Sequence, residues 1–254
     1  MSKIFIYLII NSFLSFIGLS LYWITSIYTN FIYLYILHLL KSFTLLFVTS
    51  YLQRNKPYIT HRKQNYNFKS ILCVCSSVLI ETITYYSIAY FYTFKTTILL
   101  YDFLMFIPTS LLFELIYDFL HYWIHRLLHT KYLFAYIHKQ HHLKVYTTYL
   151  DVYYQNPLDL ILSNSIPFCL SLLLLYKISY LQFILLTVYK TAVEIAGHTG
   201  KKIYPTSSFP QFPWIVKYFN IELYTEDHDL HHRHLNCNYS KRLSLWDKLF
   251  YTYK

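Results

Sequence analysis

The chain has 254 residues, of which 56% are hydrophobic and only 13% are charged, and its mean hydropathy is +0.31. Soluble domains carry about 25% charged residues, so this composition argues against a soluble globular protein and favours a membrane protein. The formal net charge of +10 also occurs in nucleic-acid-binding proteins, but the apolar content argues against a nucleic-acid partner. On a membrane protein, such a charge indicates faces that meet anionic lipid headgroups.

Four apolar runs in the first 117 residues predict transmembrane helices. The first, 4–24, contains no charged residue and is long enough to span a hydrocarbon core of about 30 Å. We interpret it as a retained helix rather than a signal peptide, because no convincing small-residue cleavage site follows it. The other three runs are 31–52, 71–92 and 98–117.

The segment 53–70, between the second and third runs, is basic and contains no acidic residue. The positive-inside rule places this segment in the cytosol. The third run then leaves the cytosol and the fourth returns, so the chain re-enters the cytosol near Asp118. The basic residues of the segment are Arg54, Lys56, Arg62, Lys63 and Lys69.

Residues 121–142 hold six of the 13 histidines, just after the fourth apolar run. The first three are spaced by four residues, so on a helix they line one stripe together with Asp118. The last three follow the pattern H-x-x-H-H and would also share a helical face. In chain order the six are His121, His125, His129, His138, His141 and His142.

Further histidines follow a second apolar region, 158–193. Its two arms, 158–176 and 178–193, predict a hairpin that enters the membrane and returns, the second arm being short for a full crossing. His198, in the stretch EIAGH, comes next. The segment TEDHDLHHRH then repeats the H-x-x-H-H spacing with His228, His231 and His232. This topology places all the histidine groups on one side of the membrane.

These groups predict a metal site built on nitrogen ligands. Neutral imidazole is the commonest metal ligand near neutral pH, and a nitrogen-rich site suits Fe, Zn, Cu or Ni. The four cysteines form no C-x-x-C pair and support neither a disulfide framework nor a thiolate zinc site. Eight or nine histidines exceed what one ion can bind, so two ions sharing the set is the economical interpretation. His38, His61 and His234 lie outside the pattern and are not expected to be ligands.

The stretches DFLHYWIHRLLH, HKQHH, EIAGH and HDLHH, followed by NYSKRLSLWDKLFYTY, resemble the fatty acid hydroxylase superfamily of membrane enzymes, which includes sterol 4-methyl oxidases and sterol desaturases. The resemblance covers about 110–254 and the helix count upstream. It implies an all-α integral membrane protein with about four transmembrane helices and a membrane hairpin, 158–193. Residues 1–117 would form the transmembrane helices, and 118–254 a catalytic region with a cytosolic helical lobe.

The resemblance also implies which residues form the site. Four carboxylates would orient the histidine rings through their free N–H groups or serve as further ligands; they are Asp118, Glu194, Asp227 and Asp229. His121 is a possible additional ligand or orienting residue. The implied metal ligands are His125, His129, His138, His141, His142, His198, His228, His231 and His232.

The superfamily implies an oxidoreductase that uses two iron ions and O₂ to hydroxylate or desaturate a lipid, either a sterol or a fatty acyl or sphingolipid chain. Zinc could replace iron in purified protein. Electrons would come from NAD(P)H through cytochrome b5 or a reductase, and nothing in 1–60 resembles a fused cytochrome b5 domain. The implied location is the endoplasmic reticulum membrane, with the histidines facing the cytosol.

The sequence departs from the superfamily at one place and leaves two alternatives open. Many relatives have a His-Pro-x-Glu stretch after the second histidine group, where this chain has Asn156-Pro157-Leu158-Asp159. The alternatives are an acyl desaturase, which also uses H-x-x-H-H groups, and a non-catalytic zinc-binding membrane protein. The tight HRLLH-x8-HKQHH spacing favours the hydroxylase superfamily. If the zinc-binding protein were a transporter, its ionisable residues would be expected in mid-membrane. These histidines instead follow the ends of apolar runs, which argues against transport.

Overall fold

The computed structural model describes residues 2–28, 30–60, 68–175, 177–202 and 208–254. Within these residues the chain is helical, and three isolated bridges are the only β pairing, which confirms the predicted all-α class. Of the residues discussed above, His61, Arg62 and Lys63 lie outside the described part.

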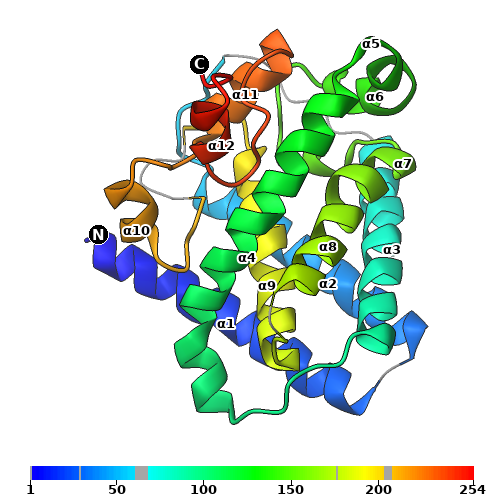
Figure 1. The fold of residues 1–254 in the computed structure, drawn as a ribbon, viewed down its shortest axis with the longest axis vertical. Coiled ribbons are helices and arrows are strands. Elements are labelled where there is room, and N and C mark those ends of the chain that lie inside the picture. Colours follow the sequence, from blue (N-terminus) through cyan, green and yellow to red (C-terminus); the bar gives the residue numbers. More distant parts are fainter. Residues whose placement is uncertain (1, 29, 61–67, 176, 203–207) are drawn as a thin grey trace.

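Long helices form the body of the molecule, and shorter elements complete one end of it (Figure 1). The long helices are α1 (Lys3–Ile27), α2 (Phe31–Leu52), α3 (Phe68–Phe91), α4 (Leu99–Leu128) and α9 (Tyr180–Gly197). The shorter elements are α5 (Lys131–Leu133), the π-helix η1 (Phe134–His138), α6 (Lys139–His142), the 3₁₀ helix η2 (Asp151–Tyr153), α7 (Pro157–Leu160), the π-helix η3 (Ile161–Ser165), α8 (Ile166–Leu174), α10 (Pro213–Tyr218), α11 (Thr225–His234) and α12 (Leu245–Leu249).

In the described part of the chain, five helical stretches are long and apolar enough to cross a membrane: α1 to α4 and the continuous stretch Pro157–Leu174. The four runs predicted in the first 117 residues are therefore all helices of spanning length. The fourth continues beyond the predicted boundary at residue 117, because no helix-breaking residue stops it before Leu128. Thirty residues make a helix of about 45 Å, which is longer than a hydrocarbon core of about 30 Å. Helix α4 can therefore cross a bilayer and still carry the first histidines beyond it.

Helix α9 corresponds to the second arm of the predicted hairpin and lies in the middle of the bundle (Figure 1), where it packs against α1, α2 and α4. It begins at a capping box, in which Ser179 and Gln182 bond each other's backbone N–H groups. Most of its residues are buried, including the ionisable Lys190 and Glu194. These polar residues explain why α9 is not among the apolar spanning stretches.

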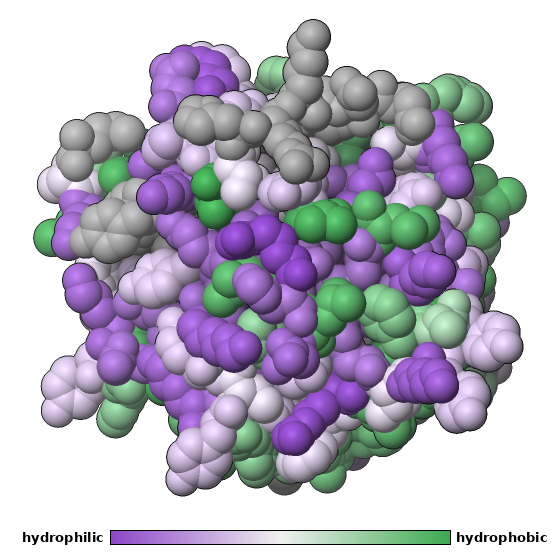
Figure 2. Space-filling model, turned by 90° about the horizontal axis from the view of Figure 1, so that it is seen from above, coloured by the Kyte–Doolittle hydropathy of each residue, from purple (hydrophilic) through white to green (hydrophobic). Residues whose placement is uncertain are grey.

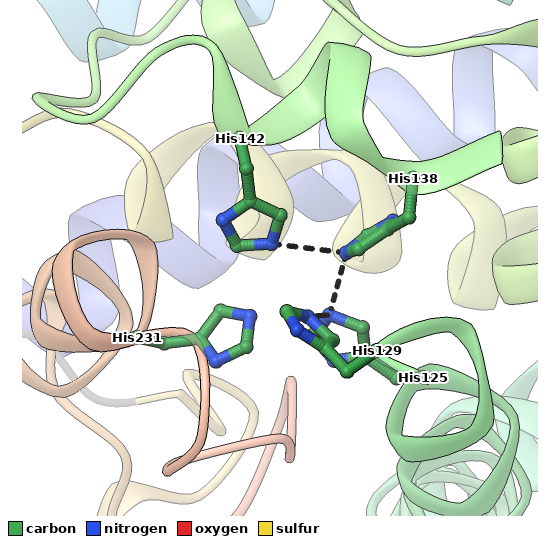
Figure 3. A group of neighbouring side chains, drawn as sticks. All are labelled: His125, His129, His138, His142 and His231. Atoms are coloured by element: carbon green, nitrogen blue, oxygen red, sulfur yellow. Dashed lines mark hydrogen bonds between the residues drawn. The ribbon is translucent and has the colours of Figure 1, made fainter. Parts of the chain in front are cut away.

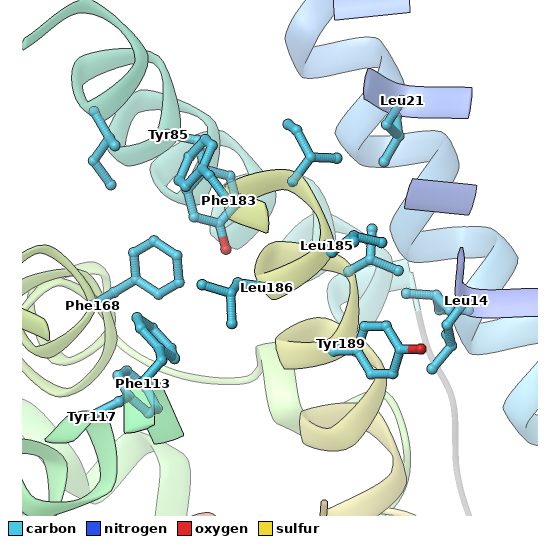
Figure 4. Close-up of a cluster of buried hydrophobic side chains, with 14 of the residues drawn as sticks. Leu14, Leu21, Tyr85, Phe113, Tyr117, Phe168, Phe183, Leu185, Leu186 and Tyr189 are labelled. Atoms are coloured by element: carbon cyan, nitrogen blue, oxygen red, sulfur yellow. The ribbon is translucent and has the colours of Figure 1, made fainter. Parts of the chain in front are cut away.

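The apolar core lies around α9 (Figure 4). Leu185 and Leu186 are each 1% exposed, and Phe183 contacts the rings of Tyr85 and Phe168. On the α1 side, a Cβ atom at Gly18 would come within 2.5 Å of Leu185 Cδ2. Glycine at this position therefore allows α1 to approach α9 closely. Helices α4 and α9 are in this way fixed to each other and to the N-terminal helices.

The histidine-bearing elements lie at one end of the bundle, where α4 ends beside α6 and α11 (Figure 1). The segment that follows α2 is joined to the same region: Ile59 N–H donates to the Gly200 carbonyl, and Lys202 N–H donates to the Pro57 carbonyl. Residues 57–59, the described part of the basic segment that makes these contacts, thus lie on the histidine side, which the positive-inside rule predicts to be cytosolic. Figure 2 looks onto this end and shows many hydrophilic residues, with apolar residues between them and at the edge.

Candidate metal centre

The structure gathers nine histidines into two groups, and these nine are the predicted ligands. Within each group the ring nitrogens that could bind an ion lie within 4.8 Å of one another. The five-histidine cluster (Figure 3) consists of His125, His129, His138, His142 and His231. The four-histidine cluster consists of His141, His198, His228 and His232.

The first H-x-x-H-H segment contributes to both clusters. His138 and His142 are four residues apart, so they lie on the same helical face, and both belong to the five-histidine cluster. His141 is adjacent to His142 in sequence and is turned by about 100° around the helix, and it belongs to the four-histidine cluster. The adjacent pair therefore divides between the two clusters.

The second H-x-x-H-H segment, on α11, repeats this arrangement with the roles exchanged. His228 and His232 belong to the four-histidine cluster, and His231 belongs to the five-histidine cluster. The rings of His142 and His232 are 4.6 Å apart between centroids, so the clusters are in contact. Two ions in these clusters would be neighbours, and each H-x-x-H-H segment would supply ligands to both of them.

Hydrogen bonds fix which nitrogen of the rings is free in the five-histidine cluster. His125 Nδ1–H donates to the Tyr239 carbonyl at 2.7 Å, and His138 Nδ1–H donates to Asp159 Oδ2 at 2.8 Å. In neutral imidazole the other nitrogen then carries a lone pair. The two Nε2 atoms nevertheless lie 3.0 Å apart, which is unfavourable unless a cation lies between the lone pairs.

His231 shows the same pattern. Its Nδ1–H donates to the Cys237 carbonyl at 2.7 Å. Its Nε2 is buried and has no hydrogen-bond partner among the described residues. A buried, unpaired nitrogen beside four other histidines fits the role of a metal ligand, since burying it without a partner costs free energy.

The four-histidine cluster is built in the same way. His198 Nδ1–H donates to the Glu194 carbonyl at 2.9 Å, so its Nε2 carries the lone pair, and this Nε2 lies 2.9 Å from His228 Nε2. His232 Nε2 lies 3.1 Å from the same atom of His228. Nitrogens bound at about 2.1 Å to one ion and at right angles to each other are about 3.0 Å apart. Both clusters therefore have the spacing that a first-row transition metal requires.

Burial lowers the pKa of eight of the nine clustered histidines, which keeps these eight rings neutral, as metal binding requires. Removal from water lowers the pKa of His198 to about 4 and that of His231 to about 3. For His142, burial acts first, and the neighbouring His231 and His138 lower the pKa further. At neutral pH the lone pairs are therefore available without prior loss of a proton.

Asp159 is a site residue that the sequence analysis did not assign. It is fully buried, its Oδ2 accepts from His138 Nδ1, and its Oδ1 has no partner among the described residues. The signal was present in the sequence, because Asp159 stands where many superfamily members have the glutamate of His-Pro-x-Glu. A carboxylate on Nδ1 fixes the tautomer and makes Nε2 a stronger ligand.

Two of the four carboxylates predicted to orient the rings bind other partners in the structure. Asp118 accepts from the backbone N–H groups of the residues 241–243, at 2.7 to 3.0 Å. Glu194 lies 3.0 Å from each of three cations, Lys190, Lys241 and Arg242. Both anchor the chain near the histidines, and neither contacts a histidine ring through its carboxylate in the described hydrogen bonds.

The other two carboxylates lie on α11. Asp227 accepts from the Tyr224 N–H at 2.7 Å as part of a capping box, and Asp229 pairs with Arg233 at 2.9 Å. They stabilise the helix that carries the third histidine group, and their described hydrogen bonds do not include a histidine ring. Orientation of the rings falls instead to Asp159 and to backbone carbonyls, which no sequence pattern reveals.

His121 lies outside both clusters. Its Nδ1–H donates to the Ser163 carbonyl at 2.6 Å, and the residue is buried at the wall of a cavity of about 30 Å³. His38 also lies outside: it is buried between α2 and α3 and bonded to Thr82, and His234 is exposed. Of the described histidines, His38, His121 and His234 therefore lie outside the two clusters, and His121 lines the cavity that touches both clusters.

The segment between α11 and α12 supplies the carbonyls of Cys237 and Tyr239 that hold His231 and His125. Asp247, which is fully buried, fixes this segment by accepting from the N–H groups of Tyr239 and Ser240, at 2.7 and 2.8 Å. The aspartate of the closing WDKLF stretch thus acts on the metal centre through the backbone.

Comparison with known proteins agrees with this geometry. The family model described as fatty acid hydroxylase matches residues 110–252. The chain is similar to the fatty acid hydroxylase vlmA of Lecanicillium sp, with 32% identity over 56% of this chain and 40% of that protein. It is also similar to the C-4 methylsterol oxidase erg25 of Schizosaccharomyces pombe, with 28% identity over 56% of this chain and 45% of that protein.

A third relative extends the range of reactions in the family. The very-long-chain aldehyde decarbonylase GL1-5 of Oryza sativa subsp. indica is 30% identical over 53% of this chain and 22% of that protein. The chain thus spans less than half the length of these curated relatives, and no solved structure matches it. The family match covers more than half of the chain and includes all nine clustered histidines. The chain therefore belongs to the fatty acid hydroxylase family.

Proposed function

We propose that this protein is a membrane-bound oxidoreductase that holds two iron ions in its two histidine clusters and uses O₂ to hydroxylate or desaturate a lipid. The observation that carries the proposal is the convergence of nine histidine nitrogens into two adjoining groups at one end of a bundle of spanning-length helices. The donor set contains only imidazole nitrogen, which suits iron and also accepts zinc.

The five-histidine cluster would hold one ion and the four-histidine cluster the other. When bound, the two irons would supply the redox chemistry that activates O₂ for attack on an unactivated C–H bond. In hydroxylation, a C–H bond and O₂ combine with two electrons and two protons to give an alcohol and one water. In desaturation, two vicinal C–H bonds are lost with the same inputs, and an alkene and two waters form.

The chain's own residues prepare the site for this chemistry. Carbonyl and carboxylate partners on Nδ1 hold His125, His138, His198 and His231 with Nε2 directed into the clusters. Burial excludes bulk water, which protects an oxidant from side reactions. The clusters lie where spanning helices end, so a lipid can reach them from the bilayer without crossing water.

The electrons would come from NAD(P)H through a separate carrier, cytochrome b5 or a reductase, at the cytosolic face of the endoplasmic reticulum. The basic segment after α2 supports this orientation, because it meets the residues 200–202, close to His198, on the histidine side. The names of the relatives support oxidation of a lipid carbon, and they cover fatty acyl, sterol and aldehyde substrates.

The alternatives are an acyl desaturase of another family and a zinc-binding membrane protein without redox activity. Membership of the fatty acid hydroxylase family counts against the first. The second is opposed by the cavity that touches both clusters, because a purely structural metal site is closed.

Lipid extracts from cells that express the wild type or the His228→Ala variant, grown under ¹⁸O₂, test the proposal. We expect the wild type alone to yield either a lipid with one ¹⁸O atom, which indicates hydroxylation, or a lipid with two fewer hydrogens, which indicates desaturation. His234→Ala, at the exposed histidine of the same helix, is the matched control and should behave as the wild type. Identical lipid profiles for the wild type and His228→Ala, with the wild type fully loaded with iron, would contradict the proposal.

A further inference from the structure

A cavity of about 30 Å³ lies against both histidine clusters. Three of its wall residues belong to the four-histidine cluster and two to the five-histidine cluster. One water needs about 10 to 15 Å³ by this kind of measure, so the cavity has room for two or three water-sized groups. It cannot hold a lipid chain. The remaining wall residues are therefore expected to recognise something small.

These remaining residues are mostly polar, and several have hydrogen-bonding capacity left over. Ser240 Oγ is buried without a partner among the described residues, and Ser240 is 2% exposed. Asn164 uses its Oδ1 to accept from Lys241 at 2.6 Å and from Tyr117 at 2.8 Å, and no described bond uses its amide N–H groups. His121 donates through Nδ1, so its Nε2 is an acceptor. A small ligand would find both donors and an acceptor among the residues that line the cavity.

Lys241 gives this wall a positive charge. Its ammonium group lies 3.0 Å from Glu194 Oε1 and 2.6 Å from Asn164 Oδ1, which accounts for two of its three donors. Glu194 is not a dedicated partner, because it is shared with two other cations. Those two cations each have a second carboxylate, since Lys190 pairs with Glu81 and Arg242 pairs with Glu114. Among the described residues, Lys241 has no second carboxylate.

We infer that this cavity is a binding site for a small anion, with Lys241 and the Asn164 amide as the positive and hydrogen-donating part of a lining that also includes three residues of the four-histidine cluster. The inference rests on the proposed function and extends it, because it names where a diatomic or triatomic molecule that carries or acquires negative charge would sit. Dioxygen is a diatomic molecule of this kind, because it acquires negative charge when it accepts electrons. Charge-assisted hydrogen bonds in a buried site are stronger than neutral ones, which gives Lys241 a role in affinity.

Azide is a suitable probe, because it is a triatomic anion that binds open metal positions. The protein loaded with cobalt(II) is titrated with sodium azide, and the visible absorption of cobalt reports binding. We expect a saturable change in the wild type, and an azide Kd at least about tenfold higher in Lys241→Gln, since a charge-assisted hydrogen bond is lost. Lys217→Gln, which removes an exposed lysine on α10, is the matched control and should keep the wild-type Kd.

A second variant guards against a folding defect in Lys241→Gln. Asn164→Asp keeps the shape and the oxygen that accepts from Lys241 and Tyr117, but it places a negative charge at the cavity wall. It should raise the azide Kd by a similar factor or more. The inference fails if both variants load cobalt fully and bind azide within twofold of the wild type, or if the cobalt-loaded wild type shows no azide-dependent change. Two cobalt ions per chain in either case would leave the proposed two-metal function standing.

Discussion

At the scale of single residues, the clusters are defined by what lies on the far side of each imidazole. A carbonyl or carboxylate on Nδ1 leaves a lone pair on Nε2, and in four rings this partner is visible in the structure. Three of the four partners are backbone carbonyls, which no sequence motif records. The fourth, Asp159, is the only carboxylate among the described residues that contacts a clustered ring. Among these four partners, only Asp159 has a counterpart in a sequence pattern, the glutamate of His-Pro-x-Glu.

Asp159→Asn should weaken metal binding about tenfold, the lower end of the range seen when a partner of a metal-bound histidine is lost, because the amide can still accept from His138 but brings no negative charge. The measurement is the fraction of metal retained after dialysis against a chelator of known affinity. Asp151→Asn is the control, since Asp151 is also buried but accepts from the Thr148 N–H away from the clusters. Equal metal retention in the wild type and Asp159→Asn would show that the contact does not matter.

At the scale of elements, the H-x-x-H-H spacing explains how two short helical segments hold two ions. Residues i and i+4 face one cluster, and residue i+3 faces the other, so each segment ties the clusters together. The segment after α11 holds rings on α4 and α11, because its Tyr239 and Cys237 carbonyls accept from His125 and His231. Asp118 and Asp247 fix this segment through its backbone N–H groups. The sequence reveals the spacing, but it does not reveal that the two segments meet with their roles exchanged.

This arrangement predicts different effects for adjacent histidines. His142→Ala removes a ligand from the five-histidine cluster, which keeps four, whereas His141→Ala leaves the four-histidine cluster with three. We therefore expect His141→Ala to lose close to one metal per chain and His142→Ala to lose less. Elemental analysis of both variants, purified side by side, gives the answer. The same metal loss in both, or a greater loss in His142→Ala, would mean that the ligands are not divided as the clusters indicate.

At the scale of the whole molecule, the composition and the apolar runs were enough to predict an all-α membrane protein, because bilayer-spanning helices need long stretches without charge. The role of α9 was harder to foresee. It carries Lys190 and Glu194 and would be a poor lipid-facing helix, yet it is central because the N-terminal helices and α4 surround it. Its buried ions are paired with residues distant in sequence, such as Glu81 and Arg242. Such pairings cannot be read from local patterns.

The buried neutral histidines also predict how the stability of the metal-free protein depends on pH. Their pKa values are lowered in the folded state, to about 4 for His198 and about 3 for His231, whereas unfolded histidines titrate near 6.5. Below about pH 6.5 the unfolded chain binds more protons than the folded chain, so stability falls as the pH falls. The melting temperature of metal-free protein in detergent should therefore drop between pH 7.5 and pH 5.5.

The dependence should be less steep in His231→Gln, which removes one of these groups, and unchanged in His234→Ala, whose histidine is exposed. A melting temperature that stays constant or rises on acidification would contradict the assignment of these rings as buried and neutral.

The central claim is that the two clusters each hold one metal ion, and the number of metal ions per chain tests it most directly. The measurement is the iron content of protein expressed with added iron and purified anaerobically in detergent, alongside the His141→Ala, His142→Ala double variant, which removes a ligand from each cluster. The account predicts about two irons per chain in the wild type and a large loss in the double variant. Well-folded wild-type protein that binds no metal, or no more than one ion per chain after iron reconstitution, would contradict it.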